Sequence, residues 1–150
     1  MYEWSGKELL TALFSAVNES IWEHTKIFSL PFVVWGFVEL FCLRPPFRRF
    51  VSAKVFGLWV MITTIPVFHY AYTGIIGTTF AVVDIVSGFV FTLLAFYVSY
   101  RLTAYAPNTE NYYNTAVFLF IIYCTMAAFF TFAPPNLNIF RDPETGMIGV

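Results

Sequence analysis

The apolar segments of this chain contain three residues that could act in chemistry: the histidines His24 and His69 and the aspartate Asp84. Two imidazoles and a carboxylate form a ligand set used by catalytic zinc sites, in which water takes the fourth position. Glu19 and Glu23, one turn apart next to His24, are then the candidates for a catalytic general base. On this interpretation the protein is a membrane-embedded, metal-dependent hydrolase that holds a divalent ion such as zinc.

A structural interpretation of the same residues stays open. The three candidate ligands are scattered along the chain, and no HExxH pattern joins them. An aspartate inside an apolar span is costly and rarely faces lipid, so Asp84 needs a partner whether or not it binds a ligand. A structural pair therefore explains Asp84 about as well as a functional site does.

Other polar side chains are expected near the same membrane surface. Asn18 offers a hydrogen bond, and Arg141 in the C-terminal tail could fold back to pair with a carboxylate. Glu23 has local alternatives, because it fits a capping box with Ser20 and lies three residues before Lys26. The candidate binding set is Asn18, Glu19, Glu23, His24, His69, Asp84 and Arg141.

The composition indicates a chain whose surface faces lipid. Hydrophobic residues make up 59 % of the sequence and charged residues only 11 %, whereas an ordinary soluble domain is about 25 % charged. A short chain exposes much of its surface, and this one has too little charge to cover that surface in water. The net charge of −1 gives no general case for nucleic-acid binding. The expected surroundings are a lipid bilayer.

The hydropathy pattern predicts an all-α, polytopic integral membrane bundle in a single domain, 1–150. A short apolar pattern over 6–17 cannot span a bilayer and predicts an amphipathic helix at the interface. The expected transmembrane helices cover about 20–43, 53–73, 78–101 and 113–133, and an outer tail follows over 134–150.

These spans place the candidate residues at a common depth. A helix rises about 1.5 Å per residue, which puts His24, His69 and Asp84 within about 10 Å of one membrane boundary. The same argument does not fix the direction in which each side chain points around its helix. The polar cluster is therefore a prediction about depth.

Basic residues predict the orientation. Arg44, Arg48, Arg49 and Lys54 are expected in the connection after the first span, and Arg101 follows the third span. The positive-inside rule assigns these connections to the cytoplasm. Both termini and the polar cluster are then on the non-cytoplasmic side of the cell membrane.

Two smaller expectations concern Glu39 and the cysteines. Glu39 lies close to Arg44, which predicts an ion pair at the membrane surface. Cys42 and Cys124 are expected at different depths, which argues against a disulfide and for buried free thiols.

Several stretches resemble a family of small bacterial multi-pass membrane proteins of unknown function. They are Ser15–His24, Tyr72–Gly77, Asp84, Ser99–Leu102 and Phe140–Pro143. The resemblance covers essentially the whole chain and implies membrane location without implying any chemistry. It also implies one more helix upstream, which would be missing from a chain that starts at Met1.

Three functions are compatible with these observations. The first is an accessory or scaffold protein in which the polar cluster holds helices together, with a second copy or another membrane subunit as partner. The second is a small-solute or ion-binding protein, with Asp84 as the binding carboxylate and kinks at Pro31 and Pro66 opening a path. The third is the metal-dependent hydrolase, so the sequence leaves open whether the protein is an enzyme.

Overall fold

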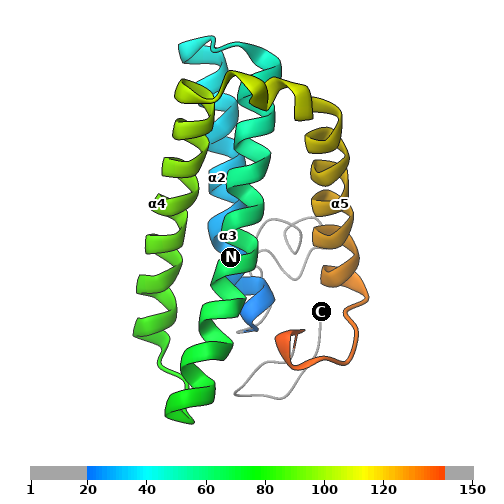
Figure 1. The fold of residues 1–150 in the computed structure, drawn as a ribbon. Coiled ribbons are helices and arrows are strands. Elements are labelled where there is room, and N and C mark those ends of the chain that lie inside the picture. The colour runs from blue at the N-terminus through cyan, green and yellow to red at the C-terminus, as the bar shows by residue number, and fades with distance from the viewer. Residues whose placement is uncertain (1–19, 141–150) are drawn as a thin grey trace.

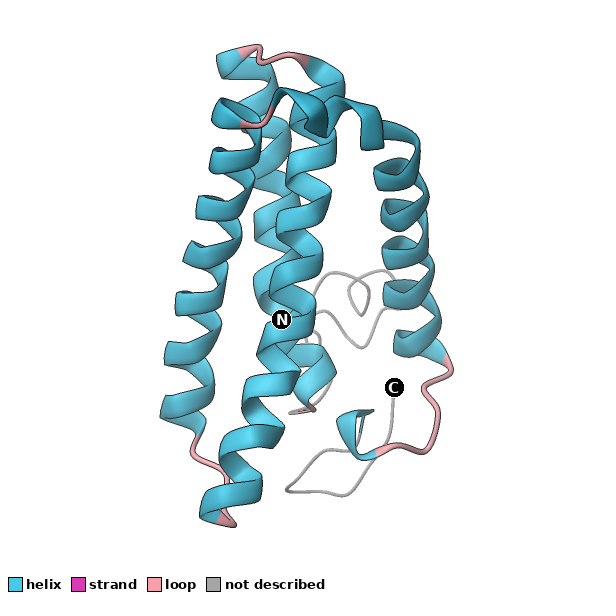
Figure 2. Ribbon diagram, viewed as in Figure 1, coloured by secondary structure: helices cyan, strands magenta, loops and turns pink. Residues whose placement is uncertain are grey.

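The computed structural model describes residues 20–140, and this part of the chain is an all-α bundle (Figures 1 and 2). Four of its helices are long and apolar enough to cross a membrane, which confirms the expected fold class. The amphipathic helix expected over 6–17 lies outside the described residues. The elements are α2 (Ile21–Leu43), α3 (Phe47–Ile76), α4 (Ala81–Tyr105), η2 (Pro107–Tyr112), α5 (Tyr113–Phe132) and η3 (Asn138–Phe140).

Local sequence explains where the first two long helices begin and end. Ser20 caps α2, because its hydroxyl accepts a hydrogen bond from the backbone N–H of Glu23 at 3.4 Å. Arg44 ends α2 in the left-handed conformation, at φ 46°. Gly77 ends α3 in the same way, at φ 82°, where a glycine has no side chain to oppose the turn.

α3 begins at Phe47 rather than at about 53, which corrects the place of Lys54. Pro45 and Pro46 precede the helix, and a proline is well suited to the residues just before or at a helix start. The arginines that follow therefore belong to the first turn of α3. Lys54, expected in a connection, lies inside the helix and faces the bundle.

The bundle has two ends, which we name by their contents. The basic end comprises the α2–α3 connection over 44–46 and η2 (Figure 1). The terminal end comprises Ser20, the α3–α4 connection over 77–80, and η3. α3 contacts α2, α4 and α5, so it is the central helix of the described bundle.

Small residues bring α3 and α4 close together. A Cβ atom added to Gly57 would lie 2.7 Å from the backbone oxygen of Ala95 and 3.2 Å from the Cβ of Ser99. Ala53 and Ala95 are both fully buried. Close approach through glycine, alanine and serine is typical of helix pairs that associate within membranes.

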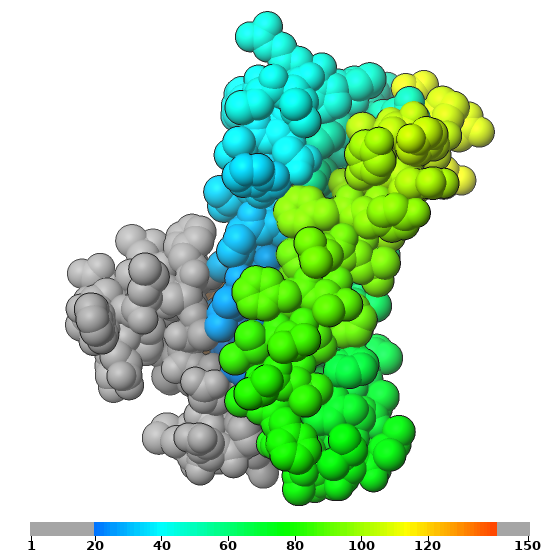
Figure 3. Space-filling model, turned by 90° about the vertical axis from the view of Figure 1, so that its left-hand side faces the viewer, coloured from blue at the N-terminus to red at the C-terminus, as the bar shows by residue number. Residues whose placement is uncertain are grey.

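The outer surface of the bundle is apolar. Figure 3 shows a face of the bundle on which α4 is prominent. Large apolar residues of α4 are exposed, among them Val82, Phe89 and Leu93. In water such a surface would be an aggregation hazard, whereas in a bilayer it is the normal exterior.

Both cysteines are free, as expected, but they are exposed rather than buried, because Cys42 and Cys124 lie on the outer faces of their helices.

Candidate functional site

A histidine–aspartate pair joins α3 and α4 near the terminal end. The Nδ1 atom of His69 lies 2.8 Å from Oδ1 of Asp84. The Tyr72 hydroxyl donates to the same carboxylate oxygen at 2.9 Å, and the backbone N–H of Phe80 donates to that hydroxyl at 3.3 Å. His69 and Tyr72 are buried and the Asp84 side chain is 12 % exposed, so the carboxylate faces the neighbouring helix, as expected for a carboxylate in an apolar span.

This arrangement fixes the histidine ring. An Nδ1–H that donates to Asp84 leaves the Nε2 atom as the basic nitrogen. The Tyr72 ring packs edge-on against the His69 ring, with 5.4 Å between the centroids. The pair therefore crosslinks two helices.

A buried lysine joins α2 and α5 at the same end of the bundle. The Lys26 ammonium lies 2.9 Å from Oε2 of Glu23 and donates to the Thr131 hydroxyl at 2.9 Å. Lys26 is only 2 % exposed. The expected pairing of Glu23 with Lys26 is present, and the hydroxyl of α5 extends it to a second helix.

A second hydrogen bond connects the same two helices nearer the middle. The Tyr123 hydroxyl donates to the Ser29 hydroxyl at 2.9 Å, and both side chains are buried. The Trp59 indole N–H of α3 donates to the backbone oxygen of Leu119 at 3.3 Å. A few isolated hydrogen bonds thus hold α5 to both α2 and α3.

A third polar pair lies in the half of the bundle nearer the basic end. The Lys54 ammonium is 2.7 Å from Oε2 of Glu39, so Glu39 pairs across to α3 and not with Arg44 as expected. Lys54 also lies over the ring of Phe32 at 4.8 Å and that of Phe96 at 4.5 Å (ammonium to centroid). The aromatic faces stabilise an ammonium that has lost most of its water.

The structure does not bring the three predicted metal ligands together. Among residues 20–140 no group of three or more His, Cys, Asp and Glu side chains could hold a metal ion. His69 and Asp84 meet, whereas His24 lies half-buried on α2. The common depth expected for these residues did not imply that their side chains point toward one another. The Asp84 carboxylate is already hydrogen-bonded to His69 and Tyr72, which both lie on α3.

The remaining predicted residues fall in two groups. Glu23 lies in the described part, buried and paired with Lys26. Asn18, Glu19 and Arg141 lie outside the described residues.

Sequence reasoning missed several members of the polar contacts. The pairing of Lys26 with Glu23 was expected, but the hydrogen bond from Lys26 to Thr131 of α5 was not. Tyr72 lies three residues after His69 and so shares its face of α3. Thr131 carried no comparable signal, because a threonine hydroxyl within a helix often bonds to its own backbone, as Thr131 also does. Tyr123 is one of many aromatic residues in the spans, so its type did not single it out.

Comparison with known proteins places the chain in a family. The family of unknown function DUF6512 matches over residues 1–150. The chain belongs to it. No curated protein and no solved structure matches the chain. DUF6512 membership agrees with the expectation of a family without an assigned chemistry, so any function must be argued from the contacts described above.

Proposed function

We propose that this DUF6512 protein is a membrane-embedded accessory or scaffold protein, whose polar side chains hold its helices in one arrangement. The observation that supports this proposal is that each major helix interface carries its own polar contact. The contacts are Glu39–Lys54 between α2 and α3, His69–Asp84 between α3 and α4, and Trp59–Leu119 between α3 and α5; Lys26–Thr131 also links α2 to α5.

The distribution of these contacts favours a structural role. A binding or catalytic site gathers its polar groups at one place, whereas these pairs are spread over both halves of the bundle. Hydrogen bonds between helices specify packing in lipid, where apolar contact alone discriminates poorly between arrangements. A partner membrane subunit or a second copy would then pack on the apolar exterior.

The orientation is part of the proposal. The basic end carries Arg44, Arg48 and Arg49, and Arg101 lies near the same end on α4. The positive-inside rule places this end in the cytoplasm and the terminal end, with His69 and Asp84, on the non-cytoplasmic side. The assignment does not need Lys54, whose charge is paired with Glu39 inside the bundle.

A labelling experiment tests this orientation. Cys42 is exposed and lies next to the last residue of α2, at the basic end. A membrane-impermeant maleimide should label Cys42 in inside-out vesicles and fail to label it in right-side-out vesicles. Cys42→Ser is the control for signal from Cys124, and labelling from the opposite side would reverse the assigned orientation.

A flux experiment tests the scaffold role itself. Wild type and Asp84→Asn are reconstituted into liposomes that hold a pH gradient, with Thr63→Val as control, since within residues 20–140 the Thr63 hydroxyl bonds only to its own helix. A scaffold leaves the gradient to decay as in empty liposomes for all three proteins, while Asp84→Asn unfolds more readily in detergent. Fast decay with wild type that Asp84→Asn abolishes would refute the scaffold role.

The second candidate is proton binding, and one observation favours it. Asp84 and His69 form a titratable pair inside a span, and intramembrane pairs of this kind occur in proton pathways. The flux experiment separates the two functions, because only proton transport requires the charge of Asp84 for gradient decay.

A further inference from the structure

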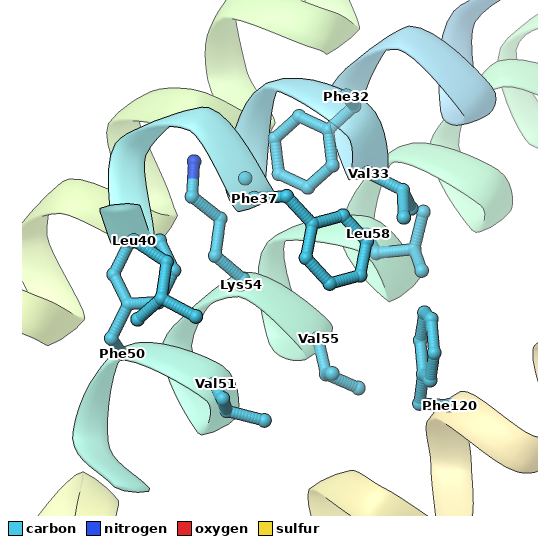
Figure 4. A pocket seen from close by; sticks show the side chains of 11 residues that line it. Phe32, Val33, Phe37, Leu40, Phe50, Val51, Lys54, Val55, Leu58 and Phe120 are labelled. Carbon is cyan, nitrogen blue, oxygen red and sulfur yellow. The ribbon is translucent and has the colours of Figure 1, made fainter. Parts of the chain in front are cut away.

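An apolar cavity of about 150 Å³ opens between α2, α3 and α5 in the half of the bundle nearer the basic end (Figure 4). Val51 and Val55 of α3 line it together with Phe37 of α2 and Phe120 of α5. Lys54 contributes its carbon chain, while its ammonium pairs with Glu39 of α2. A cavity of about this volume with apolar walls holds a small hydrocarbon such as benzene.

A polar cavity of about 390 Å³ lies between the first turn of α3 and the start of α5. Arg48, Asn111 and Asn114 line it, and Glu110 and Tyr113 complete it.

The Arg48 guanidinium lines this cavity, and its hydrogen-bond donors are not engaged by the described part of the chain. It lies 5.5 Å from the Tyr113 ring centroid, and within residues 20–140 it donates no hydrogen bond. The neighbouring Arg49, in contrast, donates from Nε to the backbone oxygen of Leu102 at 3.3 Å. Arg48 therefore has its donors available for a ligand.

The two cavities follow one another along the same helix faces. Arg48 of the polar cavity and Val51 and Val55 of the apolar cavity are spaced three and four residues apart, which puts them on one face of α3. Tyr113 and Phe120 are two turns apart on one face of α5. A single elongated ligand can therefore contact both cavities, with its polar part at the end of the bundle.

We propose that this composite groove binds one anionic phospholipid. Its phosphate would be held by Arg48, which suits phosphate through its planar fork of donors, with the amide groups of Asn111 and Asn114 beside it. The first part of one acyl chain would enter the apolar cavity. Glu110 lines the same cavity as Arg48, but Arg44 and Arg49 add two positive charges around the start of α3, so the local charge favours an anionic headgroup over a zwitterionic one. The groove is distant from His69 and Asp84 and goes beyond the scaffold role.

The headgroup half is tested by lipid binding to purified protein in a neutral detergent. Phosphatidylglycerol and phosphatidylcholine with identical chains are titrated separately, and bound lipid is counted by native mass spectrometry. Wild type should prefer phosphatidylglycerol, and Arg48→Gln should weaken that binding roughly tenfold, as expected for the loss of a charged hydrogen-bond donor. The matched control is Arg101→Gln, which removes an arginine from α4 at the same end and should leave binding unchanged.

The acyl-chain half is tested by filling the apolar cavity. Val51→Trp should abolish phosphatidylglycerol binding, whereas Val67→Trp, on an exposed face of α3, should not. Inorganic phosphate alone should not compete with the lipid. Equal binding of both lipids, equal loss in Arg48→Gln and Arg101→Gln, or full competition by phosphate would each overturn the proposal. None of these results depends on the gradient decay that tests the scaffold role.

Discussion

The α3–α4 interface and the attachment of α5 show two ways of joining helices in one small bundle. α3 and α4 approach closely through small residues such as Gly57 and Ala95, and one ionisable pair, His69 with Asp84, reinforces them. α5 packs mainly on α3 and only weakly on α2, and the contacts between α5 and α2 include two hydrogen bonds, from Lys26 to Thr131 and from Tyr123 to Ser29.

The difference shows what small residues contribute in lipid. Where side chains are short, backbones meet and dispersion contacts stabilise the pair along its length. Where a helix is held by a few polar contacts, space remains between them, and the apolar cavity beside Phe120 is such a space. The close interface is thus expected to dominate stability, and the looser one leaves room for a lipid chain.

The largest loss is expected from removing the carboxylate at the close interface. Asp84→Leu leaves His69 and the Tyr72 hydroxyl buried without their acceptor, so the free energy of unfolding should fall by about 3 kcal/mol. Equilibrium unfolding in mixed detergent micelles measures this change.

A double variant checks the reason for that loss. Asp84→Leu combined with His69→Phe removes both partners of the pair and should recover part of the stability, since no buried imidazole is then left without its acceptor and only the Tyr72 hydroxyl still lacks one. A loss of unfolding free energy in the double variant that exceeds the summed losses of the two single variants would contradict a simple pairwise interaction.

A smaller loss is expected from crowding the close interface. In Gly57→Ala the new Cβ would meet the Ala95 backbone oxygen at 2.7 Å, so the helices must separate, at a cost of about 2 kcal/mol. Gly36→Ala is the matched control, because its Cβ would lie 3.6 Å from the Lys54 side chain, an ordinary contact. Equal losses in the two variants, measured by the same unfolding experiment, would show that helix contact at Gly57 is not close.

The smallest effect is expected at the attachment of α5. Tyr123→Phe removes the hydrogen bond to Ser29 without changing the shape of the ring, and should cost about 0.6 kcal/mol, as a typical hydrogen bond between membrane helices does. Thermal unfolding in detergent should therefore place this variant between wild type and Gly57→Ala. A loss of stability larger than that of Gly57→Ala would mean that the attachment of α5 contributes more to stability than the α3–α4 interface.

Sequence alone predicted the helical class and part of the polar contacts. The Ser20 cap and the proximity of Glu23 to Lys26 follow from spacing within one helix, and both are present. Asp84 was expected to point inward because lipid disfavours a carboxylate, and it does meet His69. These predictions succeeded because each depends on spacing along one helix or on depth in the membrane.

Contacts that depend on rotation about the helix axis were not predictable. His24 was expected at the same depth as His69, yet the two do not share a metal site. Glu39 pairs with Lys54 because α3 starts directly after its prolines, which places Lys54 inside the helix. The cysteines were expected inside, yet each helix of so small a bundle turns a wide face outward, and the thiols lie on it. Depth is encoded in hydropathy, whereas the facing of helices is decided by packing between distant segments.

For a bundle that spans a bilayer, the length of α3 has a consequence. Its 30 residues rise about 45 Å, while the hydrocarbon layer of a typical bilayer is about 30 Å thick. The helix must therefore tilt or let its final turns, beyond His69, emerge among the headgroups. A thicker bilayer would draw those turns inward and desolvate the region around Asp84, so lipids of different chain length should change the stability of the protein.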